Sequence, residues 1–181
     1  MTNKVFIQVI KYINNLIKDT KFDTHVYVVG GAVRDLLMEN EIKDIDIVID
    51  LPNGGIDFSK YLYSKNLLTH EPVIYPNYGT SMFTLKEFQN LEIECVHTRK
   101  EQYKERNLSQ EFGTLKEDIY SRDFTCNTLL YDISDNKIID ITGYGLKDIK
   151  DKIIRSPRAL IIIKILYLFE LFILTNNNFL V

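Results

Sequence analysis

Apolar side chains recur at helical spacing over the first twenty residues. The recurring positions are Val5, Phe6, Val9, Ile10, Ile13, Leu16 and Ile17. This i, i+3, i+4 periodicity is typical of an amphipathic helix that buries one face. The polar face carries few lysines, which favours packing on a protein core over binding at a membrane surface. Lys4, Lys11 and Lys18 interrupt the segment and no cleavage site follows, so it is not a secretory signal peptide.

Short β-branched runs that end at turn residues predict the strands of a sheet. The strand-like runs lie at 26–29, 45–49, 80–85 and 91–98. Helices are predicted over 32–37 and 57–65. Two further segments, 124–133 and 137–141, bracket a turn at 134–136. Helical and extended segments therefore mix along the chain.

Two segments depart from this alternation. Residues 99–111 are mostly charged or amide-bearing and show no apolar period, which predicts an exposed, mobile loop. In the second segment, 159–174, only Lys164 and Glu170 break an apolar run. A membrane span needs about 20 apolar residues, so this run is short for one. It predicts a buried helix, or an interface with a second copy of the chain or a separate helical subunit.

Composition narrows the class of protein. The 181 residues are 45% hydrophobic, which is enough for one domain with a core and a fragment of a second. A net charge of −3 argues against a stand-alone nucleic-acid binder that relies on a dense positive face. Cys95 and Cys126 are far apart and form no CxxC pattern, which fits a reducing compartment. We therefore expect a cytoplasmic protein with no membrane partner.

The first candidate chemistry lies where the strand at 26–29 meets the next helix. Gly30 and Gly31 form a tight turn whose backbone N–H groups suit an anion such as a phosphate, and Arg34 adds a positive charge one turn later. Asp44 and Asp46 then share one face of the next strand, because side chains on a strand alternate. Alone, such a pair is usually a solvated strand end. Beside a phosphate site, two aligned carboxylates are what Mg²⁺ binds.

A third carboxylate is available on the strand at 91–98. Glu92 and Glu94 share one face of it, and one of them could complete a two-metal site that activates an attacking oxygen and steadies a leaving one. An amphipathic strand with its acids in water fits the same pattern equally well. His97 alternates to the face opposite Glu94 and is interpreted as structural.

Three motifs together resemble a known family. Val28-Val-Gly-Gly-Ala-Val-Arg-Asp-Leu-Leu and Lys43-Asp-Ile-Asp-Ile resemble the opening motif of the class II tRNA nucleotidyltransferase (CCA-adding enzyme) and poly(A) polymerase head domain, a branch of the polymerase-β-like nucleotidyltransferases. Glu117-Asp-Ile-Tyr-Ser-Arg-Asp-Phe-Thr-Cys-Asn-Thr-Leu resembles its Arg-Arg-Asp motif, with Ser121 in place of the first arginine. The segment from Asp140 to Arg155 is similar to the one that links head to neck. The motifs follow the family's order.

The resemblance implies a role for each matched residue. Asp44 and Asp46 would be catalytic and would hold Mg²⁺, as two ions, with Glu94 as a further metal ligand. The residues implied to bind the nucleotide are Gly30, Gly31, Arg34, Arg122, Asp123, Asn127 and Arg158. The implied fold is an α+β head over residues 1–155, with a mixed, twisted sheet flanked by helices. Residues 156–181 would begin a helical neck that is truncated or degenerate.

The implied reaction is metal-dependent nucleotidyl transfer from ATP or CTP to an RNA 3′ end. The acceptor would be tRNA in CCA addition, or another RNA in a poly(A)-type activity. The reaction leaves little covalent chemistry to the protein, so catalysis would consist of positioning and charge neutralisation.

The match fails where the family chooses the base. Arg155-Ser-Pro-Arg-Ala-Leu-Ile-Ile-Ile-Lys stands in place of a Glu-Asp pair followed by arginines, and Ile161 occupies an arginine position. A site without those polar groups is expected to discriminate poorly between bases. This departure supports an alternative, a non-catalytic or truncated remnant that binds a nucleotide or a partner subunit.

Overall fold

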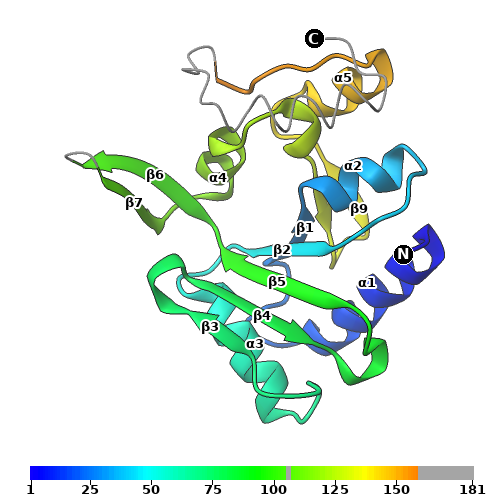
Figure 1. Cartoon of the computed structure of the whole chain (residues 1–181), viewed down its shortest axis with the longest axis vertical. Helices are drawn as coiled ribbons and strands as arrows, with labels where there is room; N and C mark the ends of the chain where they lie inside the picture. The colour runs from blue at the N-terminus through cyan, green and yellow to red at the C-terminus, as the bar shows by residue number, and fades with distance from the viewer. Residues whose placement is uncertain (105–106, 159–181) are drawn as a thin grey trace.

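A seven-stranded mixed sheet organises the chain. The computed structural model describes residues 1–104 and 107–158. The strands of the sheet are β1 (Val26–Val29), β2 (Ile45–Ile49), β3 (Val73–Tyr75), β4 (Thr80–Thr84), β5 (Glu92–His97), β8 (Leu130–Asp132) and β9 (Lys137–Ile139). They lie in the order β3-β4-β5-β2-β1-β8-β9 (Figure 1). Only β2 and β5 pair in parallel within this sheet, and the other neighbours are antiparallel.

Helices and a separate ribbon complete the described chain. The helices are α1 (Asn3–Ile17), α2 (Gly31–Leu37), α3 (Gly54–Ser64), α4 (Leu115–Ser121) and α5 (Gly145–Asp151), with short 3₁₀ turns η1 (Pro76–Tyr78), η2 (Lys86–Phe88) and η3 (Thr125–Asn127). Strands β6 (Arg99–Lys104) and β7 (Asn107–Phe112) form a two-stranded ribbon that projects beside α4 (Figure 1). The architecture is α+β, which confirms the expected fold class.

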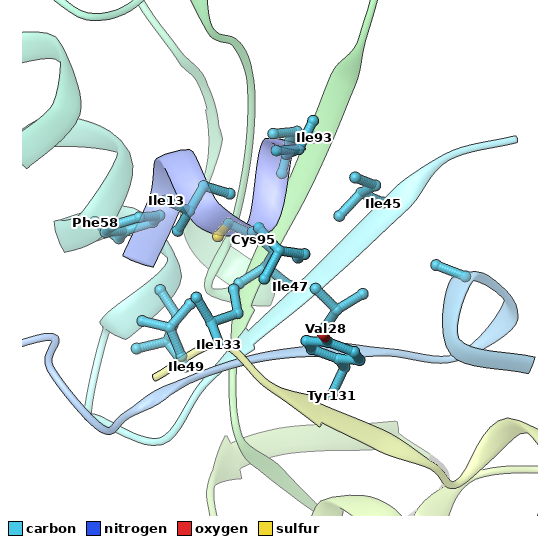
Figure 2. Close-up of a cluster of buried hydrophobic side chains, with 14 of the residues drawn as sticks. Ile13, Val28, Ile45, Ile47, Ile49, Phe58, Ile93, Cys95, Tyr131 and Ile133 are labelled. Carbon is cyan, nitrogen blue, oxygen red and sulfur yellow. The ribbon is translucent and has the colours of Figure 1, made fainter. Parts of the chain in front are cut away.

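The main core lies on one face of the sheet, under α1 and α3. Ile45, Ile47 and Ile49 point from β2 to this face, where Ile13 of α1 and Phe58 of α3 meet them (Figure 2). All five side chains are fully buried. Burying such a side chain contributes about 1.5–3 kcal/mol. The alternation of β2 is thereby fixed, so the intervening residues must face the other side of the sheet.

That other side carries a smaller core and the candidate chemistry. Val29, Val48 and Leu130 pack there against Ile119 of α4. Asp46 lies on the same face as Val48, two residues earlier on β2. The apolar pattern of β2 thus turns an acidic residue away from the main core and towards the open part of the sheet.

The charged segment after β5 is a hairpin, and the predicted loop over 99–111 is wrong. Arg99 pairs with Phe112, and the antiparallel register continues to the end of β6. A two-stranded ribbon outside the main sheet need not bury one face, so its sequence lacks the alternation that identifies a strand.

Three smaller differences also have local causes. The segment 124–133 begins with η3 and is extended only at β8, because buried Asn127 and its neighbours form a turn. Helix α4, absent from the expected elements, starts with a capping box in which Thr114 and Glu117 exchange hydrogen bonds. Strand β3 is a three-residue edge strand, too short for its pattern to show. The predicted helix and interface at 159–174 lie outside the described residues.

Within residues 1–104 and 107–158, no helix combines the length and apolar character needed to cross a membrane. Cys95 and Cys126 are both buried and neither forms a disulfide.

Candidate active site

Two strands bring acidic side chains together on the open face of the sheet. Asp46 on β2 lies opposite Glu94 on β5 in their parallel register. Asp44 immediately precedes β2 and is exposed, as is Glu94, whereas Asp46 is partly buried. The sheet therefore gathers the acidic residues predicted from the sequence. The charges of Asp44 and Glu94 both act on the carboxyl of Asp46.

Asp46 experiences the combined effect of these neighbours. Burial raises the pKa of its carboxyl to about 6, with further contributions from the charges of Asp44 and Glu94, while Arg122 opposes the shift. A carboxylate that is desolvated beside like charges is stabilised by a cation. The donor set therefore fits a hard divalent ion.

The described residues contain no group of three His, Cys, Asp or Glu side chains placed to hold a metal ion by themselves. Asp44, Asp46 and Glu94 thus do not form a three-ligand cage. Mg²⁺ is usually held by one or two carboxylates together with substrate phosphates, and the Asp44 and Asp46 pair meets that requirement. Glu94 as a direct metal ligand stays a prediction.

The glycine turn touches the acidic group directly. Gly30 has a φ of 71°, a conformation that favours glycine. A Cβ placed on it would lie 3.5 Å from Nη1 of Arg122 and 3.6 Å from Oδ2 of Asp46. The backbone of the turn, a guanidinium and a carboxylate therefore converge on one point. Gly31 begins α2, and its own Cβ position lies 3.4 Å from Nη2 of Arg34.

Arg34 is held in place by its neighbour Asp35 and by Asn127, which lies 93 residues later in the chain. Its Nε and Nη2 donate to the two carboxylate oxygens of Asp35, each at 3.0 Å. Its Nη1 donates to Oδ1 of Asn127 at 2.8 Å, and Nδ2 of Asn127 donates to Oδ1 of Asp123 at 3.3 Å. Three of the predicted nucleotide-binding residues thus form one hydrogen-bonded chain beside the glycine turn.

Arg122 is positioned by Asp118, a residue without a role in the predicted site. Its Nη2 donates to Oδ2 of Asp118 at 3.1 Å, and the side chain of Asp118 is 2% exposed. The other oxygen of Asp118 accepts the backbone N–H of Arg99 at 3.2 Å. Asp118 and Arg122 are four residues apart across the end of α4, a spacing that would have predicted the pair.

Arg122 also retains an unused donor. Its Nε is buried and has no hydrogen-bond partner in the described structure. The part of the guanidinium nearest the turn is Nη1, 3.5 Å from the Cβ position on Gly30.

The segment after α5 is tied to the site through buried Asp148. Its Oδ2 accepts from Oγ1 of Thr125 at 2.6 Å and from Nε of Arg155 at 2.9 Å. The backbone N–H of Thr125 donates to the carbonyl oxygen of Arg155 at 2.8 Å. These bonds fix η3, which contains Asn127. Arg158 is exposed at the end of the described chain, and its contact with a nucleotide stays a prediction.

Comparison with known proteins identifies the family. A family model described as the poly(A) polymerase head domain matches residues 26–155. The chain belongs to this family. The match runs from the glycine turn to Arg155, leaves Arg158 outside, and confirms the resemblance.

Relatives of this chain include tRNA nucleotidyltransferases and poly(A) polymerase I of Escherichia coli. The chain is 32% identical over 169 residues to tRNA nucleotidyltransferase cca1 of Schizosaccharomyces pombe, covering 84% of the chain and 32% of the relative. It is 34% identical over 134 residues to the A-adding tRNA nucleotidyltransferase of Aquifex aeolicus, covering 71% of the chain and 15% of the relative. The chain thus spans a third or less of these two relatives.

Solved structures of CCA-adding enzymes share the fold. An apo form of a CCA-adding enzyme superimposes with a TM-score of 0.70 and 30% identity, over 84% of this chain and 35% of that one. A tRNA nucleotidyltransferase complexed with a primer tRNA and an incoming ATP analog gives a TM-score of 0.64 and 29% identity, over 81% of this chain and 39% of that one.

Proposed function

We propose that the chain is the catalytic head of an RNA nucleotidyltransferase that transfers nucleotides from ATP or CTP to a tRNA 3′ end. The observation that carries this proposal is the convergence of Asp46, the Gly30 turn and Arg122 on one point of the open sheet face. Carboxylates for a cation and donors for phosphate are the two requirements of phosphoryl transfer. Similar structures of a tRNA nucleotidyltransferase with a primer tRNA and an ATP analog, and of CCA-adding enzyme with CTP or ATP, support the choice of substrates.

The reaction forms one bond and breaks one. The 3′ oxygen of the RNA attacks the α-phosphorus, the bond to the bridging oxygen of the β-phosphate breaks, and pyrophosphate leaves. The proton of the hydroxyl passes to water. Backbone N–H groups of Gly30 and Gly31 and the guanidiniums of Arg34 and Arg122 bind the triphosphate and offset its charge.

Asp44 and Asp46 would hold Mg²⁺. When bound, the ion neutralises phosphate charge and favours ionisation of the attacking hydroxyl. The protein's own contribution is positioning: Asp118 orients Arg122, and the chain of Asn127 and Asp123 orients Arg34. The proposal includes two Mg²⁺ ions at this pair of carboxylates.

The choice of base is expected to be weak. Arg155 is engaged with Asp148, and the acidic pair that the family places after it is absent from the sequence. We therefore expect similar kcat/KM values for ATP and CTP, whereas a site that hydrogen-bonds the base would prefer one nucleotide by a large factor. The alternative is a non-catalytic remnant that binds a nucleotide or a partner subunit, and the intact acidic cluster favours catalysis over it.

Cellular context belongs to the same proposal. We infer a cytoplasmic location, and association with a second copy or a helical subunit through residues 159–174. Two of the relatives in yeasts are named as mitochondrial enzymes, so location is to be tested by fractionation in the source cell.

Incorporation of labelled nucleotide tests the proposal. The protein is incubated with Mg²⁺, a tRNA that lacks its 3′ CCA and labelled ATP or CTP in separate reactions. We expect incorporation with both nucleotides, and a larger yield on tRNA than on an unstructured RNA of equal length. Loss of incorporation in Asp46→Asn but not in Asp151→Asn, an exposed acid on α5, would locate the activity. Incorporation that Asp46→Asn leaves unchanged would contradict the proposal.

A further inference from the structure

A second concave feature lies on the same sheet face as the carboxylates. A pocket of about 270 Å³ is lined by Tyr75, Tyr78, Thr80, Met82, Glu94 and Arg99. Glu94 is opposite Asp46 in one direction and opposite Met82 of β4 in the other. Neighbouring strands are about 4.8 Å apart, so Glu94 and Met82, on the near side of the pocket, lie within about 10 Å of Asp46. Tyr75, on the far side, lies one strand further away.

The wall of the pocket is aromatic and accessible. Tyr75 on the edge strand β3 is 43% exposed, and Tyr78 in η1 is 61% exposed. Both rings are therefore accessible to a flat partner that stacks on them. The pocket is smaller than the roughly 300–1,000 Å³ typical of drug-sized ligands, which suits a single flat ring system.

The tyrosine wall is held rigidly against β5. Gly79, which follows Tyr78, has a φ of 61°. A Cβ placed on Gly79 would lie 1.9 Å from Cε1 of His97, so the imidazole ring occupies that space. The close contact between a glycine and a buried ring fixes the η1 turn, and with it the place of Tyr78.

The opposite wall is connected to the nucleotide side of the site. Arg99 lines the pocket, and Asp118 accepts its backbone N–H while also accepting from Arg122. One buried carboxylate therefore positions both the arginine beside the glycine turn and the arginine beside the tyrosines. The pocket and the proposed triphosphate site are parts of one framework on either side of Asp46.

We propose that this pocket binds the last base at the single-stranded 3′ end of the RNA acceptor, stacked on Tyr75 and Tyr78, with Arg99 near its phosphate. The assignment rests on the proposed function. In an in-line displacement the attacking oxygen and the leaving pyrophosphate occupy opposite sides of the phosphorus. The glycine turn and Arg34 lie on the β1 side of Asp46, so the acceptor must approach from the β5 side, where the pocket opens.

Aromatic faces beside a guanidinium match this occupant. Bases of single-stranded nucleic acid stack on aromatic side chains whatever their sequence, and arginine adds a contact to the backbone or ring. Such a wall holds successive 3′ ends without reading them. That property is what an enzyme needs if its acceptor terminus changes with each nucleotide added.

Photo-cross-linking tests where the acceptor end lies, independently of turnover. A single-stranded RNA with 4-thiouridine as its 3′-terminal nucleotide is irradiated with the full chain and digested with trypsin. Trypsin cuts after Lys65 and Lys86, so the tyrosine wall falls in peptide 66–86. We expect the cross-link in peptide 66–86 or in 87–99, which ends at Arg99. A cross-link confined to other peptides, or none, would overturn the assignment.

Kinetics of tyrosine variants test what the wall does. The double variant Tyr75→Ala, Tyr78→Ala is expected to raise KM for the RNA about 5- to 100-fold, from the usual effect of removing a stacking ring. KM for ATP should change less than twofold. The matching Phe variants should restore the acceptor KM, because the ring rather than the hydroxyl carries the stacking. Tyr63→Ala, an exposed tyrosine on α3, is the control.

Different results would contradict the proposed function and the proposed base pocket. Cross-linking in peptide 66–86 by a protein that transfers no nucleotide would contradict the proposed function and leave the base pocket in place. Transfer with an unchanged acceptor KM in the double Ala variant would contradict the pocket and leave the function in place. Equal rises in the KM of RNA and ATP would show a general loss of structure and would also overturn the pocket.

Discussion

Asp118 accepts hydrogen bonds from the side chain of Arg122, four residues later, and from the backbone N–H of Arg99, 19 residues earlier. The same carboxylate thus joins the end of α4 to the start of the β6–β7 ribbon. It is almost completely buried, so the two donors stabilise its charge and it fixes their positions.

Replacing Asp118 with Asn is expected to disturb the site more than the fold. The amide keeps the size of the side chain but weakens its bond to Arg122 and frees the guanidinium to move. We expect kcat/KM for ATP to fall about 10- to 100-fold, because charge-assisted hydrogen bonds contribute about 1.5–3 kcal/mol. Steady-state kinetics with varied ATP measure this, and Asp151→Asn is the matched surface control. An unchanged kcat/KM would show that Asp118 does not position Arg122.

The raised pKa of Asp46 predicts how stability depends on pH without metal. Its carboxyl has a folded-state pKa of about 6 against an ordinary 3.8, so the folded state favours the protonated form. The associated stability is present below about pH 4 and is lost as pH rises through 6. At pH 8 with EDTA, Asp46→Asn should therefore be more stable than wild type by about 1–3 kcal/mol. Urea unfolding at pH 5 and 8 measures the difference, and equal stabilities at pH 8 would contradict the raised pKa.

Added Mg²⁺ is expected to reverse that order. An ion that binds only the folded state stabilises it, by about 2.7 kcal/mol when its concentration is one hundred times Kd. The midpoint of thermal unfolding of wild type at pH 8 should rise with Mg²⁺ and fall back on chelation. Asp46→Asn should show little change, while Asp151→Asn should behave as wild type. A rise of equal size in Asp46→Asn would place the ion elsewhere.

The buried Asp148 should matter for stability rather than for chemistry. It accepts from Thr125 and Arg155, and it holds η3 against the residues that follow α5. Asp148→Ala should lower the free energy of unfolding by about 2–4 kcal/mol, since buried hydrogen-bonding groups lose their acceptor. Chemical denaturation measures the change. A loss below about 0.5 kcal/mol would show that these bonds do not stabilise the fold.

Alternation along single strands allowed the sequence to predict the acidic site. In β2 the isoleucines at 45, 47 and 49 demand a buried face, so Asp46 had to point the other way. Likewise, two glycines after a β-branched run predicted the turn that meets Asp46. The side of the sheet that Asp46 faces and the position of the glycine turn each depend on residues adjacent in sequence. In the structure the turn lies against Asp46.

Other parts depend on contacts that no local pattern shows. The pairing of Asp46 with Glu94 requires the parallel register of two strands separated by α3 and the β3–β4 hairpin. The β6–β7 ribbon pairs only with itself, outside the main sheet, and its sequence carries no apolar period. The pocket at Tyr75 and Tyr78 depends on the Gly79 turn seated on His97, a contact between elements far apart in the chain.

The central claim is that Asp44 and Asp46 form the catalytic centre. Single-turnover transfer from labelled ATP to a tRNA lacking its terminal adenosine tests it most directly, with wild type, Asp44→Asn, Asp46→Asn and Asp151→Asn at saturating Mg²⁺. We predict that each of the two site variants slows transfer about 100-fold or more, while tRNA binding stays within about threefold of wild type. Transfer at the wild-type rate in both site variants would contradict the account.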